Sequence, residues 1–432
     1  MSLISTKTFI NMFKDNKDID FSHIVNASAP GRVNIIGEHT DYSGYCVLPC
    51  ALSQRIYVIC AKGEKGGLMS VKNVDSSFQN HVFSISDRYD QLKIPCAITW
   101  SDYLLCGYFA ALSIAKDSNM NLSSIEYNLY MLVEGLVPYG SGLSSSSALV
   151  VATALSLVKL WGLPVDMGKI AEKCIEAERI IGTLGGGMDQ TISCLGVKGK
   201  ALYILPGEPI EEITLPDDLC LVIADSLVRA EKGSGVKLAF NTRVVECRVA
   251  AIYLAAFLGC KDLTPIKKLK DCQKLFENNI FQNLNANDSE KCLDDFIKYA
   301  NDILCNKFYT IKDIEDIISQ MTGQNFTLFD YFRDSSSAIE VLENVGSFKL
   351  KQRCLHVLEE TKRVISFKNE CNNISKDSFK LGALLNESHR SLRDLYECSC
   401  KELDEIQQYA IDNGIMFIIT LLIWPFNIWF SI

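Results

Sequence analysis

The chain has no excess of positive charge. Its 432 residues include 43 lysines and arginines against 52 aspartates and glutamates, a formal net charge of −9 at pH 7. A broad nucleic-acid surface needs a basic field, so this composition argues against one. It does not exclude phosphate binding, because backbone amides and a few local cations can hold an anion whatever the global sign.

Other absences narrow the class further. The N-terminus lacks the long apolar core of a signal peptide and turns acidic where cleavage would fall. The 17 cysteines are scattered and odd in number, so we expect reduced thiols in a cytoplasmic protein. Cys398 and Cys400 form a lone C-x-C without the second pair that a zinc site needs. We see no internal repeat and no low-complexity linker.

Length and hydrophobic pattern together predict two domains of mixed secondary structure. A chain of 432 residues is too long for one core, and 48% hydrophobic residues suit a globular protein. Strands are expected at residues 55–61, 81–86, 125–132, 201–205 and 219–225. Helices are expected at residues 101–115, 145–160, 165–181, 236–257, 311–321, 348–364, 378–397 and 401–413. The pattern predicts an α+β fold with one lobe at 1–205 and a second, mainly helical lobe at 206–414.

The C-terminal run at residues 415–432 is uncharged, apolar and of nearly membrane-spanning length. Pro425 and Asn427 weaken it as a spanning helix, and no charged residue follows it as an anchor. A tail anchor is one interpretation of this run. An altered terminus, argued below, is the other.

The first candidate site is APGRVNIIGEHTDYSGYCVLP at residues 29–49. It places Arg32, Glu38, His39 and Asp41 within ten positions. A polyol ligand carries hydroxyl groups that both donate and accept, and carboxylates with an imidazole supply matching partners. Spacing alone leaves an ordinary solvated polar loop open as the alternative.

The second candidate site is PYGSGLSSSSA at residues 138–148. Gly140 and Gly142 let the backbone approach a ligand, and the loop leads into an apolar helix whose N-terminus favours phosphate. The serines at 144–147 add hydroxyl groups, one of which could ligate Mg²⁺. No G-K-[ST] follows, so the motif is not a Walker A loop. A flexible linker is disfavoured because a helical segment follows directly.

The third candidate site is ERIIGTLGGGMDQ at residues 178–190. Glu178 shares one helical face with apolar residues, and a carboxylate there needs a partner. Three glycines before Met188 and Asp189 indicate a backbone that another group approaches closely. From these residues alone, Asp189 could be a catalytic group or a helix N-cap.

The three segments together resemble the galactokinase branch of the GHMP small-molecule kinases. The first is similar to the signature G-R-V-N-L-I-G-E-H-T-D-Y, the second to P-x-x-x-G-L-S-S-S and the third to G-x-M-D-Q. Further similarity at residues 241–248 and 388–400 extends the resemblance over most of residues 25–413. Within the branch, GGGMDQ, SSSSALV and LYECSC look closer to N-acetylgalactosamine kinase.

The resemblance implies a fold and a set of residue roles. Two α+β lobes are implied, the first like ribosomal protein S5 domain 2, with the nucleotide in the cleft between them. The sugar would be held by Arg32, Glu38, His39, Asp41, Gly187 and Asp189, and the ATP phosphates by Gly140, Gly142, Ser144, Ser145 and Ser146. Ser146 and Glu178 would hold Mg²⁺, and Lys232 lies where relatives contact the nucleotide. Asp189 would accept the proton of the anomeric hydroxyl as it attacks the γ-phosphoryl group, with Arg32 offsetting negative charge.

The sequence departs from the family after Gly414. The family's third motif, T-G-A-G-x-G-G, and its final strands are absent, and the apolar run begins instead. We therefore interpret residues 415–432 as an aberrant tail from a truncated or mis-spliced gene model or isoform, and the C-terminal lobe as incomplete. Membrane association is not expected on this interpretation.

The resemblance predicts an ATP- and Mg²⁺-dependent sugar 1-kinase acting on N-acetylgalactosamine. Galactokinase activity on galactose is the nearest alternative. Gly185–Gly187, small residues beside Asp189, would leave room for a bulkier substituent on the sugar. A non-catalytic regulator that binds sugar and ATP, or an inactive isoform, is the alternative from another class. We expect a monomer with a small-molecule sugar and ATP as its partners.

Overall fold

The computed structural model describes residues 5–85, 98–216, 224–225, 234–280, 289–373, 377–413, 418–423 and 426–431. The chain forms two compact units. Unit 1 comprises Met1–Val33, Cys50–Ile181 and Gly187–Lys198, and unit 2 comprises Asn34–Pro49, Gly182–Gly186 and Gly199–Ile432. The chain thus enters unit 2 twice before residue 199, whereas the sequence predicts one boundary near residue 205.

Unit 1 is built on a mixed β-sheet. Its strands are β1 (Ile24–Asn34), β2 (Pro49–Lys65), β3 (Leu68–Asn73), β4 (His81–Ser84) and β5 (Tyr127–Gly135). They follow the order β4-β3-β5-β2, with β1 paired to β2. The pairing of β2 with β5 is antiparallel, and the pairing of β3 with β5 is parallel.

Both faces of strand β2 are covered, which explains its uninterrupted apolar run. Ile59 and Ala61 pack into a cluster that includes Phe9 and Phe13 of α1 (Thr6–Phe13). Cys60 points to the other face, where its thiol donates to the Ser156 carbonyl oxygen of a helix. A strand buried on both faces reads as continuous rather than alternating hydrophobic sequence.

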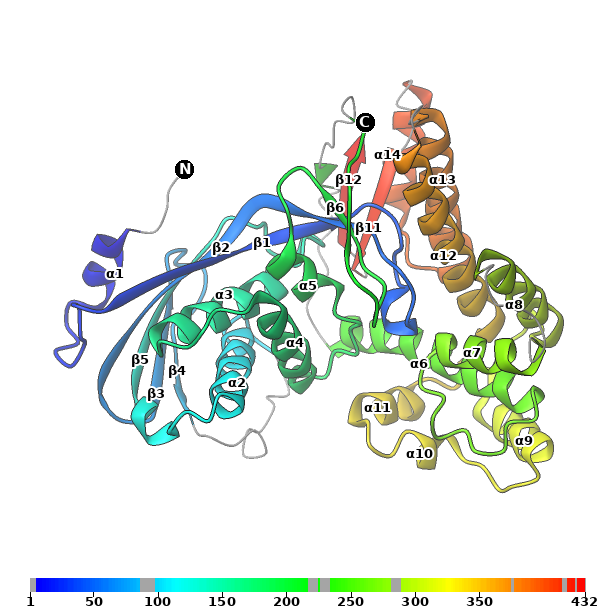
Figure 1. Ribbon diagram of the computed structural model, residues 1–432, viewed down its shortest axis with the longest axis horizontal. Helices are drawn as coiled ribbons and strands as arrows, with labels where there is room; N and C mark the ends of the chain where they lie inside the picture. Colours follow the sequence, from blue (N-terminus) through cyan, green and yellow to red (C-terminus); the bar gives the residue numbers. More distant parts are fainter. Residues whose placement is uncertain are drawn as a thin grey trace. The chain divides into compact units, whose positions relative to one another are not determined.

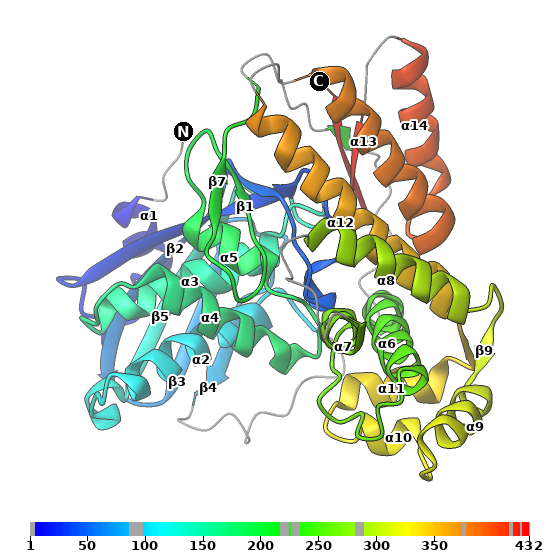
Figure 2. The ribbon, with the colours of Figure 1, turned by 45° about the vertical axis from the view of Figure 1, so that its right-hand side comes forward.

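Helices α2 (Asp102–Asp117), α3 (Ser145–Leu160), α4 (Met167–Glu178) and α5 (Met188–Leu195) gather on one face of this sheet (Figure 1, Figure 2). Helix α3 is buried over almost its whole circumference, as expected of a helix that is apolar all round. Gly107 lets α2 approach it, because a Cβ there would lie 2.5 Å from the Thr153 Cβ. A 3₁₀ turn, Arg179–Ile181, ends α4.

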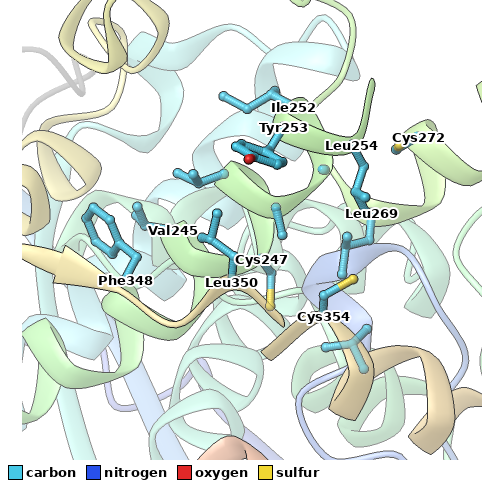
Figure 3. Close-up of a cluster of buried hydrophobic side chains, with 14 of the residues drawn as sticks. Val245, Cys247, Ile252, Tyr253, Leu254, Leu269, Cys272, Phe348, Leu350 and Cys354 are labelled. Atoms are coloured by element: carbon cyan, nitrogen blue, oxygen red, sulfur yellow. The ribbon is translucent and has the colours of Figure 1, made fainter. Parts of the chain in front are cut away.

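Unit 2 is mainly helical. Its helices are α6 (Ser234–Phe257), α7 (Leu269–Ile280), α8 (Ser289–Ile303), α9 (Ile311–Thr322), α10 (Leu328–Tyr331), α11 (Ser336–Asn344), α12 (Leu350–Asn372), α13 (Ser378–Ser391) and α14 (Lys401–Asp412). Helix α12 packs beside α6, α8 and α13. Figure 3 shows the core of this unit, where Val245, Cys247 and Leu254 of α6 meet Leu269 of α7 and Cys354 of α12.

Short strand pairs complete unit 2. Strands β6 (Ala201–Tyr203) and β7 (Glu211–Ile213) are antiparallel, as are β9 (Tyr309–Thr310) and β10 (Ser347–Phe348). The mixed α+β class predicted from sequence is confirmed. The helix predicted at 378–397 is wrong at its end, since Ser391 is followed by a π-helical turn over Leu392–Tyr396. Glu397 closes that turn in the left-handed conformation, with φ of 53°.

The apolar C-terminal run contains strands where the structure describes it. Strands β11 (Ile418–Ile423) and β12 (Phe426–Ser431) pair antiparallel, and β12 pairs with β8 (Ala224–Asp225). β-Branched and aromatic residues dominate this run, and they favour the extended backbone. Within the described parts of the chain, every helix is too short or too polar to cross a membrane.

Candidate active site

The site in unit 1 begins where strand β1 meets the Gly/Ser loop. The Arg32 backbone N–H donates to the Leu143 carbonyl oxygen at 3.1 Å. Gly31 permits this contact, because a Cβ there would lie 2.7 Å from the same oxygen. The first and second sequence motifs are therefore brought together by the backbone before any side chain contributes.

Arg32 and Asp189 form an ion pair at this point. The Arg32 Nε donates to Asp189 Oδ1 at 2.6 Å, and its Nη1 donates to the Gly142 carbonyl oxygen at 2.6 Å. The Arg32 side chain is 6% exposed and the Asp189 side chain is 24% exposed. A guanidinium can hold two acceptors at fixed angles, so Arg32 fixes the carboxylate against the Gly/Ser loop.

Asp189 is the second residue of α5 and does not cap that helix. The N-cap is Gly187, with φ of 107°, and a Cβ there would lie 2.6 Å from Ile175 Cδ1. The N-cap alternative for Asp189 is therefore wrong. Its Oδ2 accepts from the Ser144 hydroxyl at 2.5 Å. Each carboxylate oxygen has lone pairs for more than one donor, so these contacts leave acceptor capacity for a substrate hydroxyl.

The Gly/Ser loop has the geometry of an anion-binding turn. Gly140, Gly142 and Ser144 have φ of 70°, 74° and 55°, which only glycine adopts at little cost. Ser144 is the N-cap of α3, yet its side chain makes no capping hydrogen bond and bonds Asp189 instead. The amides that begin α3 at Ser145 therefore have no side-chain cap from Ser144, and such amides favour a phosphate.

Glu178 is the last residue of α4, and its side chain faces α3. The Ser147 hydroxyl lies 3.0 and 3.2 Å from its two oxygens, and Gln190 Nε2 also donates to it. Burial, helped by the charge of Asp189, raises the pKa of Glu178 to about 7 despite these two hydrogen bonds. The partner that its apolar helix face requires is thus supplied by Ser147 and Gln190.

The donor set around Glu178 suits a hard cation. Mg²⁺ prefers oxygen ligands and is commonly held by one or two carboxylates together with substrate phosphates. Glu178 and the serine hydroxyls supply oxygen donors only, and a carboxylate kept from water gains by pairing with a cation. Ser147 contacts Glu178 directly, whereas the Ser146 hydroxyl bonds the Tyr103 hydroxyl. Within the described residues, no cluster of three His, Cys, Asp or Glu side chains could form an all-protein metal site.

The rest of the first motif belongs to unit 2. Glu38 and His39 are buried, and Asp41 begins a 3₁₀ turn, Asp41–Ser43. The segment Gly182–Gly186 packs in the same unit, where a Cβ on Gly186 would lie 2.4 Å from Asp41 Cγ and from the Tyr42 nitrogen. Gly186 is therefore required by the close approach of the Asp41 turn.

His39 lies among aromatic rings. Its Nδ1 is 3.0 Å from the Tyr42 hydroxyl, which in turn bonds the Tyr396 hydroxyl. The His39 ring also lies 4.7 Å from that of Tyr396 and 5.9 Å from that of Phe240. His39 has φ of 65°, a backbone conformation that costs energy outside glycine and must be held by its surroundings.

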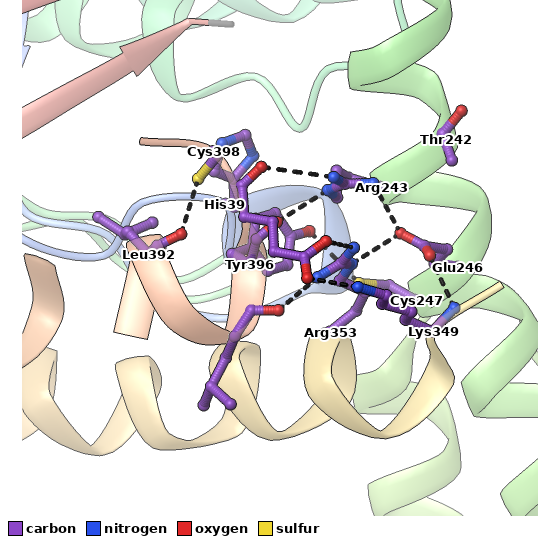
Figure 4. Close-up of polar contacts among 12 residues, drawn as sticks. His39, Thr242, Arg243, Glu246, Cys247, Lys349, Arg353, Leu392, Tyr396 and Cys398 are labelled. Atoms are coloured by element: carbon purple, nitrogen blue, oxygen red, sulfur yellow. Dashed lines mark hydrogen bonds and ion pairs between the residues drawn. The ribbon is translucent and has the colours of Figure 1, made fainter. Parts of the chain in front are cut away.

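Polar contacts fix the turn that carries Tyr396 (Figure 4). Arg243 Nε donates to the Tyr396 carbonyl oxygen at 2.9 Å. Arg353 donates to the Leu395 carbonyl oxygen and to Glu397, and both arginines pair with Glu246. Buried charges of this kind are tolerated only when paired on several sides, as they are here.

Two further buried groups, which the sequence did not single out, hold the backbone of the first motif. His356 Nε2 lies 3.1 Å from the Glu38 carbonyl oxygen, and Glu360 Oε1 accepts from the Gly37 backbone N–H at 2.9 Å. Their signal in the sequence is a histidine and a glutamate on the inward face of a helix, where an unpaired polar group would be costly.

We expect His356 to make stability depend on pH. Burial lowers the pKa of His356 from its ordinary 6.5 to about 4, with Arg363 and Arg353 adding to the effect and Glu360 opposing it. Between these values the unfolded chain binds a proton that the folded chain excludes, so stability falls as the pH falls from 6.5 to 4. Between pH 6.5 and pH 4, the melting temperature of His356→Phe should therefore fall by a few degrees less than that of wild type. Equal slopes in thermal melts would contradict this.

The predicted site residues divide as follows. The structure brings Arg32, Gly142, Ser144 and Asp189 into contact in unit 1, with Ser147 and Glu178 nearby on α3 and α4. Glu38, His39 and Asp41 lie in unit 2. Lys232 lies outside the described residues. Gln190 and Tyr103 were not predicted as site residues, although Gln190 belongs to the third motif. Ser147 was predicted only as one of four serines that could ligate Mg²⁺.

Family comparisons identify the class. The model of the GHMP kinases N-terminal domain matches residues 106–197, and the galactokinase galactose-binding signature matches residues 7–62. The crystal structure of Lactococcus lactis galactokinase complexed with galactose superposes with a TM-score of 0.66 at 22% identity, covering 99% of this chain and 89% of that one. Methanococcus jannaschii mevalonate kinase gives 0.50 at 13% identity, covering 95% and 90%. The fold and the loop-to-helix site define a GHMP-type small-molecule kinase.

Sequence relatives narrow the class to one branch. Galactokinase of Dictyostelium discoideum is 32% identical over 429 residues, covering 94% of this chain and 79% of the relative. Galactokinase of Saccharomyces cerevisiae is 33% identical over 421 residues, covering 90% and 78%. The chain belongs to the galactokinase branch of the GHMP kinases, and it is a sugar kinase.

Proposed function

We propose that this protein transfers the γ-phosphoryl group of ATP to the anomeric hydroxyl of a galactose-type sugar, releasing ADP and the sugar 1-phosphate. The observation that carries the proposal is the Arg32–Asp189 pair, held by Gly142 and Ser144 at the N-terminus of α3, which the Ser144 side chain does not cap. This arrangement sets an acceptor for a proton beside backbone donors for a phosphate. Phosphoryl transfer depends chiefly on such positioning and charge stabilisation.

Each group in the site has a distinct task in this proposal. Asp189 orients the sugar hydroxyl and takes its proton as the bond to phosphorus forms. Arg32 holds Asp189 in place and offsets the negative charge that develops on the transferred group. Gly140, Gly142, Ser145 and Ser146 cradle the nucleotide phosphates, and Ser144 supports Asp189 from the other side.

Sugar recognition is proposed for Glu38, His39 and Asp41, together with Arg32, Gly187 and Asp189. Carboxylates and an imidazole can match the hydroxyls of a hexose one by one, and a hexose lacking one of these hydroxyls would leave a polar group of the site unmatched. The burial of Glu38 and His39 supports such a role.

A bound Mg²⁺ would neutralise negative charge on the nucleotide phosphates. We propose that Glu178 holds it, with a serine hydroxyl from Ser146 or Ser147 beside it. Gln190 would then orient the Glu178 carboxylate through its hydrogen bond.

Galactose is the substrate that the comparisons favour over N-acetylgalactosamine. The relatives reported above are named galactokinase, and two of the three glycines beside Asp189 have packing reasons of their own. Gly186 admits the Asp41 turn and Gly187 admits Ile175, so neither is evidence of room for an acetamido group. Among the residues that the structure describes, nothing lies within 4 Å of a Cβ built on Gly185, which is compatible with the prediction of a preference for N-acetylgalactosamine.

A substrate panel tests this proposal. We expect ATP turnover with galactose to exceed turnover with glucose or mannose at least about 100-fold in kcat/KM, because a mismatched buried hydroxyl costs a few kcal/mol. The measurement is coupled ADP release with galactose, N-acetylgalactosamine, glucose and mannose. A higher kcat/KM for N-acetylgalactosamine would reverse the substrate assignment. Absence of turnover with every sugar, together with retained sugar and ATP binding, would favour a non-catalytic regulator.

A further inference from the structure

Helix α12 carries a row of buried polar side chains. Arg353, His356 and Glu360 are 2%, 0% and 0% exposed, and they recur at the i, i+3, i+7 spacing of one helix face. Three ionisable groups buried on one face are costly unless they are paired. Their partners in unit 2 are therefore informative, and they include backbone atoms of the first motif at residues 37 and 38 and groups of the turn at 395–397.

The tautomer of His356 follows from its two contacts. A backbone carbonyl oxygen only accepts, so the contact of Nε2 with the Glu38 oxygen requires the proton on Nε2. The neutral ring then accepts at Nδ1 from the Ser391 hydroxyl, which lies 2.8 Å away. Both ring nitrogens are satisfied in one orientation, and that orientation holds the peptide that follows Glu38.

Glu360 holds the backbone of Gly37, the residue before Glu38. Its Oε1 accepts from the Gly37 N–H at 2.9 Å and from the Ser388 hydroxyl at 2.7 Å, and its Oε2 accepts from Arg363 at 2.7 Å. Gly37 has φ of 104°, and a Cβ there would lie 2.9 Å from Val364 Cγ2 of the same helix. The backbone at Gly37 is thus seated directly on α12 by a charge-assisted hydrogen bond.

Arg353 supports His39, the third residue of this segment, through the side chain of Tyr396. It donates to the Leu395 carbonyl oxygen and to Glu397, which fixes the turn between them. The Tyr396 ring in that turn lies beside the His39 ring. The Tyr396 hydroxyl forms a hydrogen bond with the Tyr42 hydroxyl, which also contacts Nδ1 of His39. Residues 37, 38 and 39 are therefore each held, directly or through one side chain, by successive positions of α12.

We propose that Arg353, His356 and Glu360 are positioning residues for sugar recognition, holding the backbone of residues 37–39 so that Glu38 and His39 meet the sugar hydroxyls. The inference rests on the proposed function. None of the three touches the reacting atoms in this proposal. Their contribution is preorganisation, since a loop already in its binding conformation loses less entropy when the sugar binds. His39, in a strained left-handed conformation, is the residue that most needs such support.

The test separates sugar binding from chemistry and from nucleotide binding. His356→Phe keeps an aromatic ring, a slightly larger one, and removes the donor to Glu38. It is expected to raise KM for the sugar about tenfold, the value of one buried hydrogen bond. The KM for ATP and kcat should stay within about twofold. His356→Gln, which returns an amide N–H, should recover part of the loss. Glu360→Gln replaces a charged acceptor with a neutral one and should raise the sugar KM about fivefold.

Thr361→Val is the matched control on the same helix. Thr361 is buried, and its hydroxyl donates to the Val357 carbonyl oxygen of the same helix at 2.7 Å. Its KM values should match wild type even if its melting temperature falls. A merely structural role for His356 would instead lower the melting temperature and the active fraction while leaving the sugar KM unchanged.

Two outcomes overturn the inference. One is an unchanged sugar KM in both His356→Phe and Glu360→Gln, and the other is an equal rise in KM for sugar and ATP. If His356→Phe does not fold, Glu360→Gln decides alone. A wild-type protein that turns over no sugar would overturn the proposed function instead. In that case the positioning of the loop is still tested by the rise in melting temperature on adding galactose, compared between wild type and the variants.

Discussion

Asp189→Asn is expected to lower kcat about 10²- to 10⁴-fold, the range that a positioned general base contributes. An amide has the shape of the carboxylate and can still accept from Arg32, so the fold should be retained. It cannot take the proton of the sugar hydroxyl, and it brings no negative charge to orient that hydroxyl. Coupled ADP release at saturating galactose and ATP measures the effect, with thermal melts to confirm folding.

Asp166→Asn provides the control for this substitution. Asp166 is the N-cap of α4 and accepts from the Lys169 backbone N–H at 3.1 Å. Asparagine caps helices about as well as aspartate, so kcat should be unchanged. Near-normal turnover of a folded Asp189→Asn protein would show that this carboxylate neither takes the proton nor orients the substrate.

Arg32→Lys should have the second largest effect, a fall in kcat/KM of roughly 10- to 100-fold, which corresponds to one or two lost charge-assisted hydrogen bonds. Lysine keeps the charge but has no planar fork, so it cannot hold Asp189 and the Gly142 carbonyl oxygen at the same time. Asp189 is then free to leave its position against the Gly/Ser loop. Steady-state kinetics with galactose and ATP varied in turn measures the loss.

Arg55→Lys is the corresponding control. Arg55 lies on β2, and its Nε and Nη2 donate to the hydroxyl and the carbonyl oxygen of Ser28. It makes the same kind of forked contact without touching the loop or Asp189, so its loss should leave kcat/KM near wild type. A similar loss in both variants would mean that Arg32 acts only through general stability.

The sequence predicted the elements with strong periodicity and the residues in dense motifs. Helix α3 lies at Ser145–Leu160 as expected, because its apolar run and the Gly/Ser loop before it mark both the helix and its start. The presence of Arg32 and Asp189 in one sugar-binding site was anticipated from the family resemblance, not from spacing. The residues alone left Asp189 open as a helix cap, and only the left-handed Gly187 at the N-cap decides that question.

The features that the sequence did not predict depend on contacts between residues far apart along the chain. His356 and Glu360 lie more than 300 positions from the backbone atoms that they hold, with sequence separations of 318 and 323 residues. A buried histidine in a helix is ordinarily a satisfied core residue, so the sequence gives it no special weight. The sequence also did not predict that Asn34–Pro49 and Gly182–Gly186 belong to unit 2. Each segment is joined to that unit by packing against residues distant in the chain.

The C-terminal run shows how local composition can support two interpretations. Its hydrophobicity is that of a membrane helix, but its β-branched and aromatic residues also fit strands, and strands β11 and β12 are what the structure contains there. Partner strands decide between the two, and the β8 residue that pairs with Ile428 is Asp225, just over 200 positions earlier in the chain. Hydropathy within a single window does not contain that information.

Phosphorus NMR of the reaction of the purified protein with galactose, ATP and Mg²⁺ tests the central claim most directly. We predict one new phosphomonoester signal, coupled to the anomeric proton of galactose and growing in step with ADP, and no such signal with Asp189→Asn over the same time. Phosphate on any other hydroxyl, or hydrolysis of ATP to inorganic phosphate without a sugar phosphate, would contradict the assignment of Asp189 to the anomeric hydroxyl.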